Sequence, residues 1–151
     1  MIEIRQATIA DARMLAELRW EFRTKRDAPT ESHDAFVRRC TAWMRRELPT
    51  GTSWKVWVAV QDHVIAGQVW VHTVQKIPNP IAEAESLAYV SNLFVKESAR
   101  GGTGSRLLEQ AVTWCRKNHI DRVVLWPTKR SVSLYLSQGF SHGGDVMELK
   151  V

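Results

Sequence analysis

The order of apolar and polar residues predicts a set of strands that begins near the N-terminus. Residues 2–6 alternate between the two kinds, as a half-buried strand does. Segments 53–60 and 64–74 are rich in valine and tryptophan and lie close together in the chain, so they indicate an antiparallel hairpin. Segments 86–95 and 121–126 are apolar almost throughout, which is typical of strands that are buried on both faces of a sheet.

Helical spacing of apolar residues marks four further segments. The first follows a T-x-x-D pattern at Thr8 and Asp11, which caps the N-termini of helices. The last stops at Gly139, in the position of a C-terminal cap. The four predicted helices cover about residues 9–22, 31–47, 103–117 and 129–138.

The order of these elements predicts an α/β (α+β) fold. We expect a mixed, mostly antiparallel central sheet of about six to seven strands, flanked by about four helices. Strand 87–96, helix 103–117 and strand 121–126 form one right-handed crossover with parallel strands. Residues 140–151 predict a terminal hairpin that turns at Gly143-Gly144. No repeat or linker divides the chain, so we expect a single domain over residues 1–151.

Charge and composition limit the class of function. The net charge is +5, and many arginines lie before residue 47, which suits either an anionic partner or solvated helix faces. No nucleic-acid motif accompanies them, so we expect no nucleic-acid partner. No apolar run is long enough to cross a bilayer, and the N-terminus lacks an apolar signal core, so we expect a cytoplasmic protein without membrane contact.

The cysteines and histidines predict no metal centre. Cys40 and Cys115 are far apart, belong to no C-x-x-C pair and are expected to be packed as thiols. The five histidines show no metal-ligand spacing with each other or with cysteine, so we expect no metal.

A glycine-rich turn between a strand and a helix is the first candidate for chemistry. Gly101, Gly102 and Gly104 precede the helix over 103–117, whose first amides have no partner within the helix. Such a turn can bind an anion, with Arg100 and the hydroxyls of Thr103 and Ser105 adding contacts to a phosphate. The alternative is a merely tight connection. The spacing matches neither the dinucleotide fingerprint nor the P-loop.

Two segments together resemble a known family. "YVSNLFVKESARGGTGSRLLEQAV" is similar to the acyl-CoA-binding segment of the GNAT N-acetyltransferases, and "LWPTKRSVSLYLSQGF" is similar to the second signature of that superfamily. The order of elements over the whole chain fits as well. Aligned from the helix, Gly102 and Gly104 match the family glycines and Ala99 stands where Arg or Gln is usual. Aligned from the strand, Arg100 matches instead, so the turn is one residue shorter than usual.

The resemblance implies a reaction and a set of contacts. GNAT enzymes transfer an acetyl or related acyl group from acetyl-CoA, as co-substrate, to an amine. By resemblance, the acyl-CoA arm lies along the end of the strand before the turn, and the phosphates lie at the turn. Tyr135 matches the tyrosine that often serves as the general acid, and we favour this role over the alternative of an aromatic packing residue. The residues that the resemblance assigns to acyl-CoA are Leu93, Phe94, Val95, Arg100, Gly101, Gly102, Thr103, Gly104, Ser105, Thr128 and Ser131.

The general base and the acceptor remain open at this stage. Many relatives carry a carboxylate on the strand before the turn, but here that strand holds Asn92, which can orient a water or the amine. Glu83 and Glu85 lie upstream, in a loop that either borders the substrate or is simply solvated. The acceptor is expected to be an amine of a small molecule or a peptide, and exposed sheet edges suggest a homodimer. The alternative function is a non-catalytic acyl-CoA-binding or regulatory domain.

Overall fold

The computed structural model describes residues 1–49 and 52–151, which fold around one mixed sheet with helices on both faces. The strands follow the order β1-β2-β3-β4-β5; all neighbours are antiparallel except β4 and β5, which are parallel. The strands are β1 (Ile2–Gln6), β2 (Trp54–Gln61), β3 (Val64–Gln75), β4 (Ser86–Val95) and β5 (Val123–Val124).

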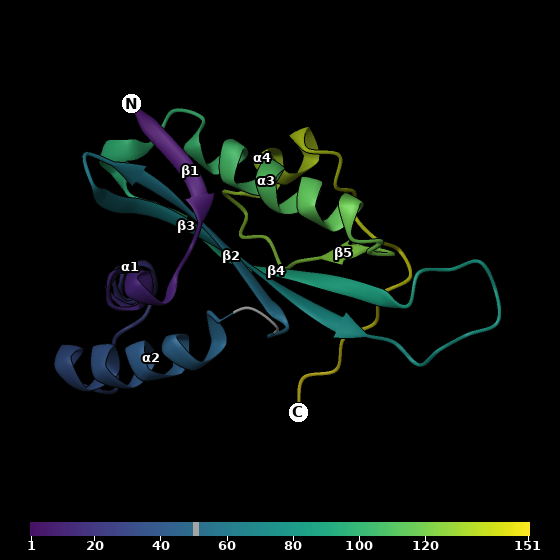
Figure 1. Ribbon diagram of the computed structural model, residues 1–151, viewed down its shortest axis with the longest axis horizontal. Helices are drawn as coiled ribbons and strands as arrows, with labels where there is room; N and C mark the ends of the chain where they lie inside the picture. The colour runs from purple at the N-terminus through teal and green to yellow at the C-terminus, as the bar shows by residue number, and fades with distance from the viewer. Residues whose placement is uncertain (50–51) are drawn as a thin grey trace.

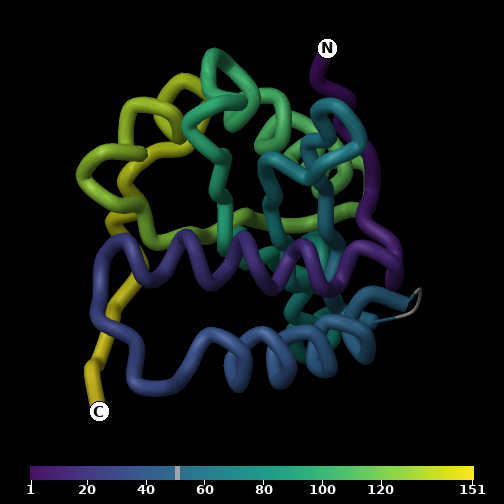
Figure 2. The backbone as a smooth tube through the Cα atoms, turned by 90° about the vertical axis from the view of Figure 1, so that its left-hand side faces the viewer, coloured from purple at the N-terminus to yellow at the C-terminus, as the bar shows by residue number. Residues whose placement is uncertain are grey.

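The helices form two layers on opposite faces of the sheet (Figure 1). The α-helices are α1 (Ala12–Thr24), α2 (His33–Glu47), α3 (Thr103–Lys117) and α4 (Val132–Ser137). The two short 3-10 helices are η1 (Ile9–Asp11) and η2 (Glu97–Ala99). Helices α1 and α2 run side by side and cover one face, whereas α3 and α4 lie on the other (Figures 1 and 2). The segment between β3 and β4 extends away from the body.

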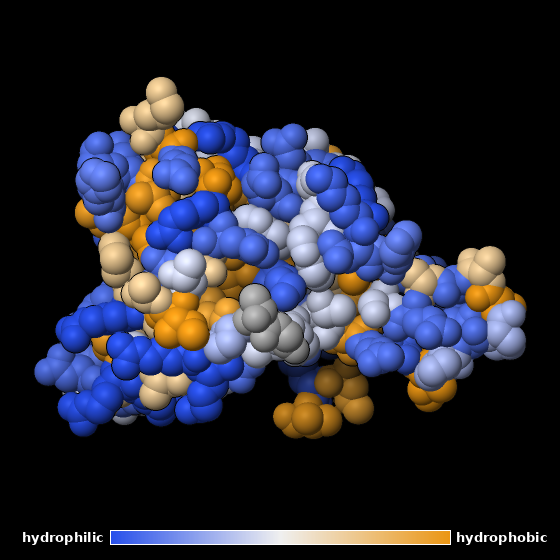
Figure 3. Space-filling model, viewed as in Figure 1, coloured by the Kyte–Doolittle hydropathy of each residue, from blue (hydrophilic) through white to orange (hydrophobic). Residues whose placement is uncertain are grey.

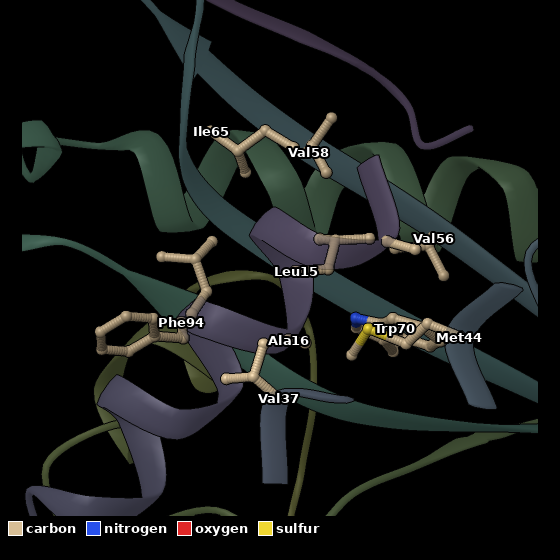
Figure 4. Packing of buried hydrophobic residues seen from close by; sticks show 11 residues of the cluster. Leu15, Ala16, Val37, Met44, Val56, Val58, Ile65, Trp70 and Phe94 are labelled. Carbon is tan, nitrogen blue, oxygen red and sulfur yellow. The ribbon is translucent and has the colours of Figure 1, made fainter. Parts of the chain in front are cut away.

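Alternation along the strands divides the buried apolar residues into two clusters. Val58 and Trp70 face α1 and α2, where they meet Leu15 and Met44 (Figure 4). The other face packs against α3 and is built from residues such as Val69, Val71, Ala88, Leu107 and Leu108. Each cluster removes apolar side chains from water, and this removal is the main favourable contribution to folding.

Tryptophan is concentrated where α2 meets the sheet. The ring centroids of Trp43, Trp54 and Trp70 lie 5.6–5.8 Å from one another. The indole N–H of buried Trp70 donates to Oε1 of Gln68 at 2.9 Å, and the Gln68 side chain is itself completely buried. This hydrogen bond satisfies a polar group that would otherwise be costly to bury. On the opposite face, Trp57 and Trp114 are in contact, with centroids 6.2 Å apart.

Several predictions from the sequence are confirmed. The β2–β3 hairpin, β4 and α3 lie within one residue of the predicted bounds, and α1 and α2 within three. The Thr8–Asp11 cap is also present, because the amide and hydroxyl of Thr8 both donate to a carboxylate oxygen of Asp11. Gly139 ends α4 with a φ of 91°. Its amide donates to Leu136 and that of Phe140 donates to Tyr135, which is the Schellman arrangement.

The predicted strand count was wrong, because the sheet has five strands where six to seven were expected. Residues 141–151 contain no strand, and the hairpin at Gly143-Gly144 is absent. A terminal ribbon with two flexible glycines and no face packed on the core has little to stabilise it. Its apolar side chains are instead exposed, including Met147 and Leu149, and the chain end forms an orange projection below the body in Figure 3.

The predicted strand 121–126 is present only in part. Its pairing with β4 covers Ala88↔Val123 and Tyr89↔Val124. Leu125 and Trp126 continue the chain without a ladder partner because β4 has parted from β5 at that level. Among the described helices, none is long and apolar enough to span a membrane.

Candidate active site

The turn between β4 and α3 leaves a run of backbone amides without partners. The amide of Arg100 donates to Glu97 and that of Arg106 donates to Gly102, but the amides of residues 101–105 between them have no acceptor in the described structure. The amides of residues 103–105 are the first of α3 and those of Gly101 and Gly102 precede them, at the helix end where the dipole adds partial positive charge. This arrangement is suited to binding a phosphate group.

Two glycines of the turn are required by the backbone conformation. Gly101 and Gly102 have φ values of 97° and 95°, in the left-handed region that side chains disfavour, and α3 begins at the next residue. A Cβ at either position would meet nothing within 4 Å, so crowding is not the reason. Gly104 is helical, and a Cβ there would lie 3.7 Å from Leu134 and 3.9 Å from Val95. The turn, α4 and the end of β4 therefore converge at Gly104.

A β-bulge at Asn92 separates β4 from β5. Ser91 pairs with Trp70, but Phe94 pairs with Gln68, so two residues of β4 lie opposite one residue of β3. Asn92 is the residue that absorbs the extra length, with a φ of 55°. A bulge bends its strand and interrupts pairing, which explains why the β4–β5 ladder ends just before it.

The parted strands leave backbone groups of β4 unpaired. The amide of Lys96 donates to Ala66 of β3 at 2.8 Å. Because backbone groups alternate in direction along a strand, the amide and carbonyl of Val95 point away from β3, toward the side where β5 would otherwise lie. The Leu93 and Val95 side chains pack on the α3 face, whereas Phe94 is buried against α1 and stacks on Phe22. The main-chain groups of Val95 are thus available to a ligand on that side.

Tyr135 lies on α4, half-buried against the α3 face of the sheet. Its ring contacts Phe140 edge-on, with centroids 5.6 Å apart. Its hydroxyl has no hydrogen-bond partner among the described residues, and burial raises the pKa of Tyr135 above its usual value. The phenol is therefore neutral at physiological pH and retains a proton that it can donate. The residue before it on α4, Leu134, is the one that lies against Gly104 of the turn.

The other side chains that were predicted to bind acyl-CoA differ in which of their polar groups remain free to contact a ligand. Arg100 is partly exposed, and its guanidinium lies 3.8 Å from the Glu97 carboxylate. The hydroxyl of Thr103 is buried and donates to the carbonyl of Ala99, so that residue offers only its amide. The hydroxyls of Thr128 and Ser131 lie 3.0 Å apart.

The contact between Thr128 and Ser131 closes the turn before α4. The Ser131 hydroxyl accepts a hydrogen bond from the Thr128 amide and donates to the Thr128 carbonyl. These groups are satisfied locally. Their proposed contacts with acyl-CoA stay predictions.

The two upstream carboxylates stabilise the loop before β4. Glu83 forms an ion pair with Lys76 at 2.8 Å, and Glu85 accepts a hydrogen bond from the Asn79 amide. Lys76 also pairs with Asp121 at 3.1 Å, which connects this loop to the segment before β5. Both glutamates therefore have structural partners.

Two residues of the site escaped prediction. Arg19 of α1 donates a hydrogen bond to Oδ1 of Asn92 at 3.2 Å, across the face opposite α3. Trp126 follows β5 and contacts Tyr89 edge-on, with centroids 5.2 Å apart. The only available signal was a lone asparagine in an apolar strand, because asparagine tolerates the left-handed conformation that a bulge requires.

Phe22 and Trp43, on the two helices of the opposite face, belong to the core. Phe22 stacks on Phe94, and Trp43 packs among the tryptophans of the α2 face. Both cysteines are free thiols, and burial raises the pKa of Cys115 to about 11. Among the described residues, no group of three or more His, Cys, Asp or Glu side chains is arranged to hold a metal ion.

Comparison with known proteins identifies the family. Residues 12–140 match the model of the acetyltransferase (GNAT) family. A search of curated protein sequences found no significant match.

Solved structures share the fold at low sequence identity. A predicted acetyltransferase from Clostridium acetobutylicum, solved with acetyl-CoA, superposes with a TM-score of 0.81 at 18% identity over 99% of this chain and 96% of that chain. A GCN5-related N-acetyltransferase from Ralstonia eutropha gives 0.80 at 21% over 99% of both chains. Glucosamine-6-phosphate N-acetyltransferase from Arabidopsis thaliana gives 0.72 at 19% over 99% and 98%. With the family match over most of its length and the parted strands beside a glycine turn, the chain belongs to the acetyltransferase (GNAT) family.

Proposed function

We propose that this protein transfers an acetyl group from acetyl-CoA to a primary amine of a small molecule or peptide, by direct attack of the amine on the thioester. The observation that carries the proposal is the run of unpartnered amides at residues 101–105, next to the point where β4 parts from β5. A diphosphate supplies the acceptors that these amides lack. The unpaired groups of Val95 suit the amide-containing arm of the same molecule.

The site residues have two kinds of role, which are binding of acetyl-CoA and transfer of protons. Amides 101–105 and Arg100 bind the phosphates, while the β4 main chain positions the thioester beside the amine. Tyr135 donates a proton to the sulfur that leaves, a role consistent with its neutral and unpartnered hydroxyl. Asn92 orients the amine or a water that accepts the amine's proton. The bound coenzyme itself supplies the activated acyl group.

A second candidate function is acyl-CoA binding without catalysis. The observation in its favour is the lack of any Asp or Glu within β4, where a general base is often found in the family. This candidate shares the binding site and differs only in the absence of turnover.

Titration of the protein with acetyl-CoA, followed by a thiol-release assay across an amine panel, tests both. The acetyltransferase function is supported if acetyl-CoA binds and coenzyme A is released only when an amine is added. Binding without release from any acceptor supports the second candidate. No binding at all contradicts both, since each depends on the amides of the turn.

A further inference from the structure

Arg19 is a partly buried cation without a counterion. Its guanidinium donates to the neutral oxygen of Asn92, and it forms no ion pair among the described residues. The charged or titratable groups that act on it are Arg23, Cys40 and Tyr89, and none of these is a carboxylate. Burial, together with the positive charge of Arg23, lowers the pKa of Arg19 below its usual value. Such a charge is costly to bury when no anion compensates it.

The other arginines and lysines of this region do not share this property. Arg5 forms a two-point ion pair with Asp11, with distances of 2.8 and 2.9 Å. Lys25 pairs with Glu21 at 3.0 Å. Arg23 is exposed and lies 3.4 Å from the carboxylate of Asp27. Among these four cations, Arg19 is the one that is partly buried and has no carboxylate partner in the described chain.

The position of Arg19 connects this unpaired charge to the reaction. Asn92, its hydrogen-bond partner, forms the bulge at which β4 leaves β5. The amides of residues 101–105 lie at the start of α3, whereas Asn92 is hydrogen-bonded to Arg19 of α1, the helix that covers the opposite face of the sheet. An acceptor that reaches the parted strands from the α1 face therefore meets Arg19 before it meets the thioester.

We propose that Arg19 binds a carboxylate or phosphate group on the acceptor, so that the substrates of this protein are amines that also carry an anion. This inference rests on the proposed acetyltransferase function and names its substrate class. A guanidinium suits this task because its planar donors can engage two oxygens of one carboxylate or phosphate. Asn92 holds the guanidinium from one edge and leaves its other donors for the ligand.

The test compares matched acceptors with the wild type, Arg19→Gln and Arg13→Gln. Arg13 lies on the same helix and is exposed, so its variant controls for loss of net charge. The acceptor pairs are O-phosphoethanolamine with ethanolamine, and β-alanine with β-alaninamide. We expect Arg19→Gln to lower kcat/KM for the anionic member of each pair about 10- to 100-fold more than for the neutral member. The decisive quantity is the ratio of kcat/KM for the anionic amine to kcat/KM for its neutral partner. The change in this ratio on mutation cancels differences in amine basicity.

A binding readout separates this inference from the proposed function. With coenzyme A present, O-phosphoethanolamine is expected to raise the Tm of the wild type and of Arg13→Gln, but not that of Arg19→Gln. If neutral amines are acetylated and Arg19→Gln does not change the anionic-to-neutral ratio of kcat/KM, the acetyltransferase function is supported and the inference about Arg19 is overturned. Absence of turnover together with an Arg19-dependent Tm shift supports the anion site and contradicts the acetyltransferase.

The stability of the variant distinguishes binding from a purely structural role. Removal of an uncompensated buried charge is expected to leave the Tm of Arg19→Gln equal to or above that of the wild type. A clearly lower Tm, combined with an unchanged preference between anionic and neutral amines, would mean that Arg19 only supports the bulge, and the inference would fail.

Discussion

At the scale of single residues, the proposed chemistry depends most on Tyr135. Its hydroxyl is unpartnered, and the raised pKa means that it remains protonated at any physiological pH. Tyr135→Phe removes that hydroxyl and preserves the ring contact with Phe140. We expect kcat to fall about 100-fold or more, as is typical for loss of a general acid, while the Kd for acetyl-CoA stays the same.

Steady-state kinetics and calorimetric titration of the same preparation measure the two quantities. Leu136→Ala, at an exposed position on the same helix, serves as the control and is expected to retain kcat. Equal kcat values for Tyr135→Phe and the wild type would assign the proton to solvent instead.

Asp11 links β1 to the start of α1 and makes stability depend on pH. Its hydrogen bonds with Arg5 are the main cause that lowers the pKa of Asp11, and the amide of Thr8 adds to the effect. A carboxyl whose folded pKa is depressed contributes stability above its unfolded pKa, near 4, and that contribution is lost as pH falls through the folded value. The free energy of unfolding should therefore decrease below about pH 4.

Urea unfolding between pH 2 and pH 7 measures this dependence. Asp11→Asn is expected to be about 1–2 kcal/mol less stable at pH 7 and to show a shallower decrease in acid, because one titrating group is gone. Identical pH profiles for the two proteins would show that the Arg5 pair contributes nothing.

At the scale of elements, the start of α3 offers a matched pair of glycines. Gly102 has a left-handed φ of 95° with open space around it, so alanine there suffers only conformational strain. Gly104 is helical and has room for a Cβ at ordinary contact distances. Gly102→Ala should lower the free energy of unfolding by about 1–2 kcal/mol. Gly104→Ala should leave it unchanged or raise it, because alanine favours helix.

Thermal unfolding of both variants, with and without acetyl-CoA, provides the measurement. Gly102→Ala is also expected to weaken acetyl-CoA binding, since it disturbs the amides of the turn. Equal destabilisation by the two substitutions would argue that the local backbone conformation is not what selects glycine at position 102.

Most elements could be predicted from the sequence because their signals are local. The valine- and tryptophan-rich hairpin, the apolar run of β4 and the spacing from Leu107 to Cys115 are properties of neighbouring residues. The glycine turn was identified in the same way. The bulge at Asn92 was missed because it depends on how β4 pairs with Gln68 and Trp70 of another strand. The contact of Arg19 with Asn92 joins residues far apart in the chain, and no local pattern reports it.

The two errors in the sheet have one physical origin. A nearly continuous apolar run predicted a strand at 121–126, and the Gly143-Gly144 pair predicted a hairpin in 140–151, but a strand also needs a neighbouring strand to pair with. After Tyr89, β4 turns away from β5, so Leu125 and Trp126 have no residues of β4 to pair with. The end of the chain then lies outside the sheet, with Glu148 accepting a hydrogen bond from the Trp126 indole at 3.2 Å.

At the scale of the whole molecule, this exposed terminal segment allows the sheet itself to be tested. Residues 145–151 contribute no ladder to the sheet, and Met147 and Leu149 are among their exposed side chains. Removal of residues 145–151 should therefore change the Tm by less than about 4 °C, the shift that corresponds to 1 kcal/mol in a protein of this size. It should also reduce aggregation, since apolar surface is lost.

Differential scanning calorimetry and light scattering compare the shortened and full-length proteins. Val71 is completely buried against α3, so the decrease in Tm of Val71→Ala shows how much a true loss of core packing costs. A drop as large as that of Val71→Ala would show that the terminal residues pair with β5 in solution.

The tryptophans between α2 and the sheet give this protein an internal optical reporter. Because Trp43 belongs to α2 while Trp54 and Trp70 belong to strands, their rings stay in contact only while that helix is docked. Emission from this trio will therefore follow detachment of α2. Trp126, exposed beside the parted strands, will respond to whatever enters there. Variants that keep only this trio, or only Trp126, with phenylalanine at the other tryptophan positions can thus follow detachment of α2 separately from binding at the parted strands.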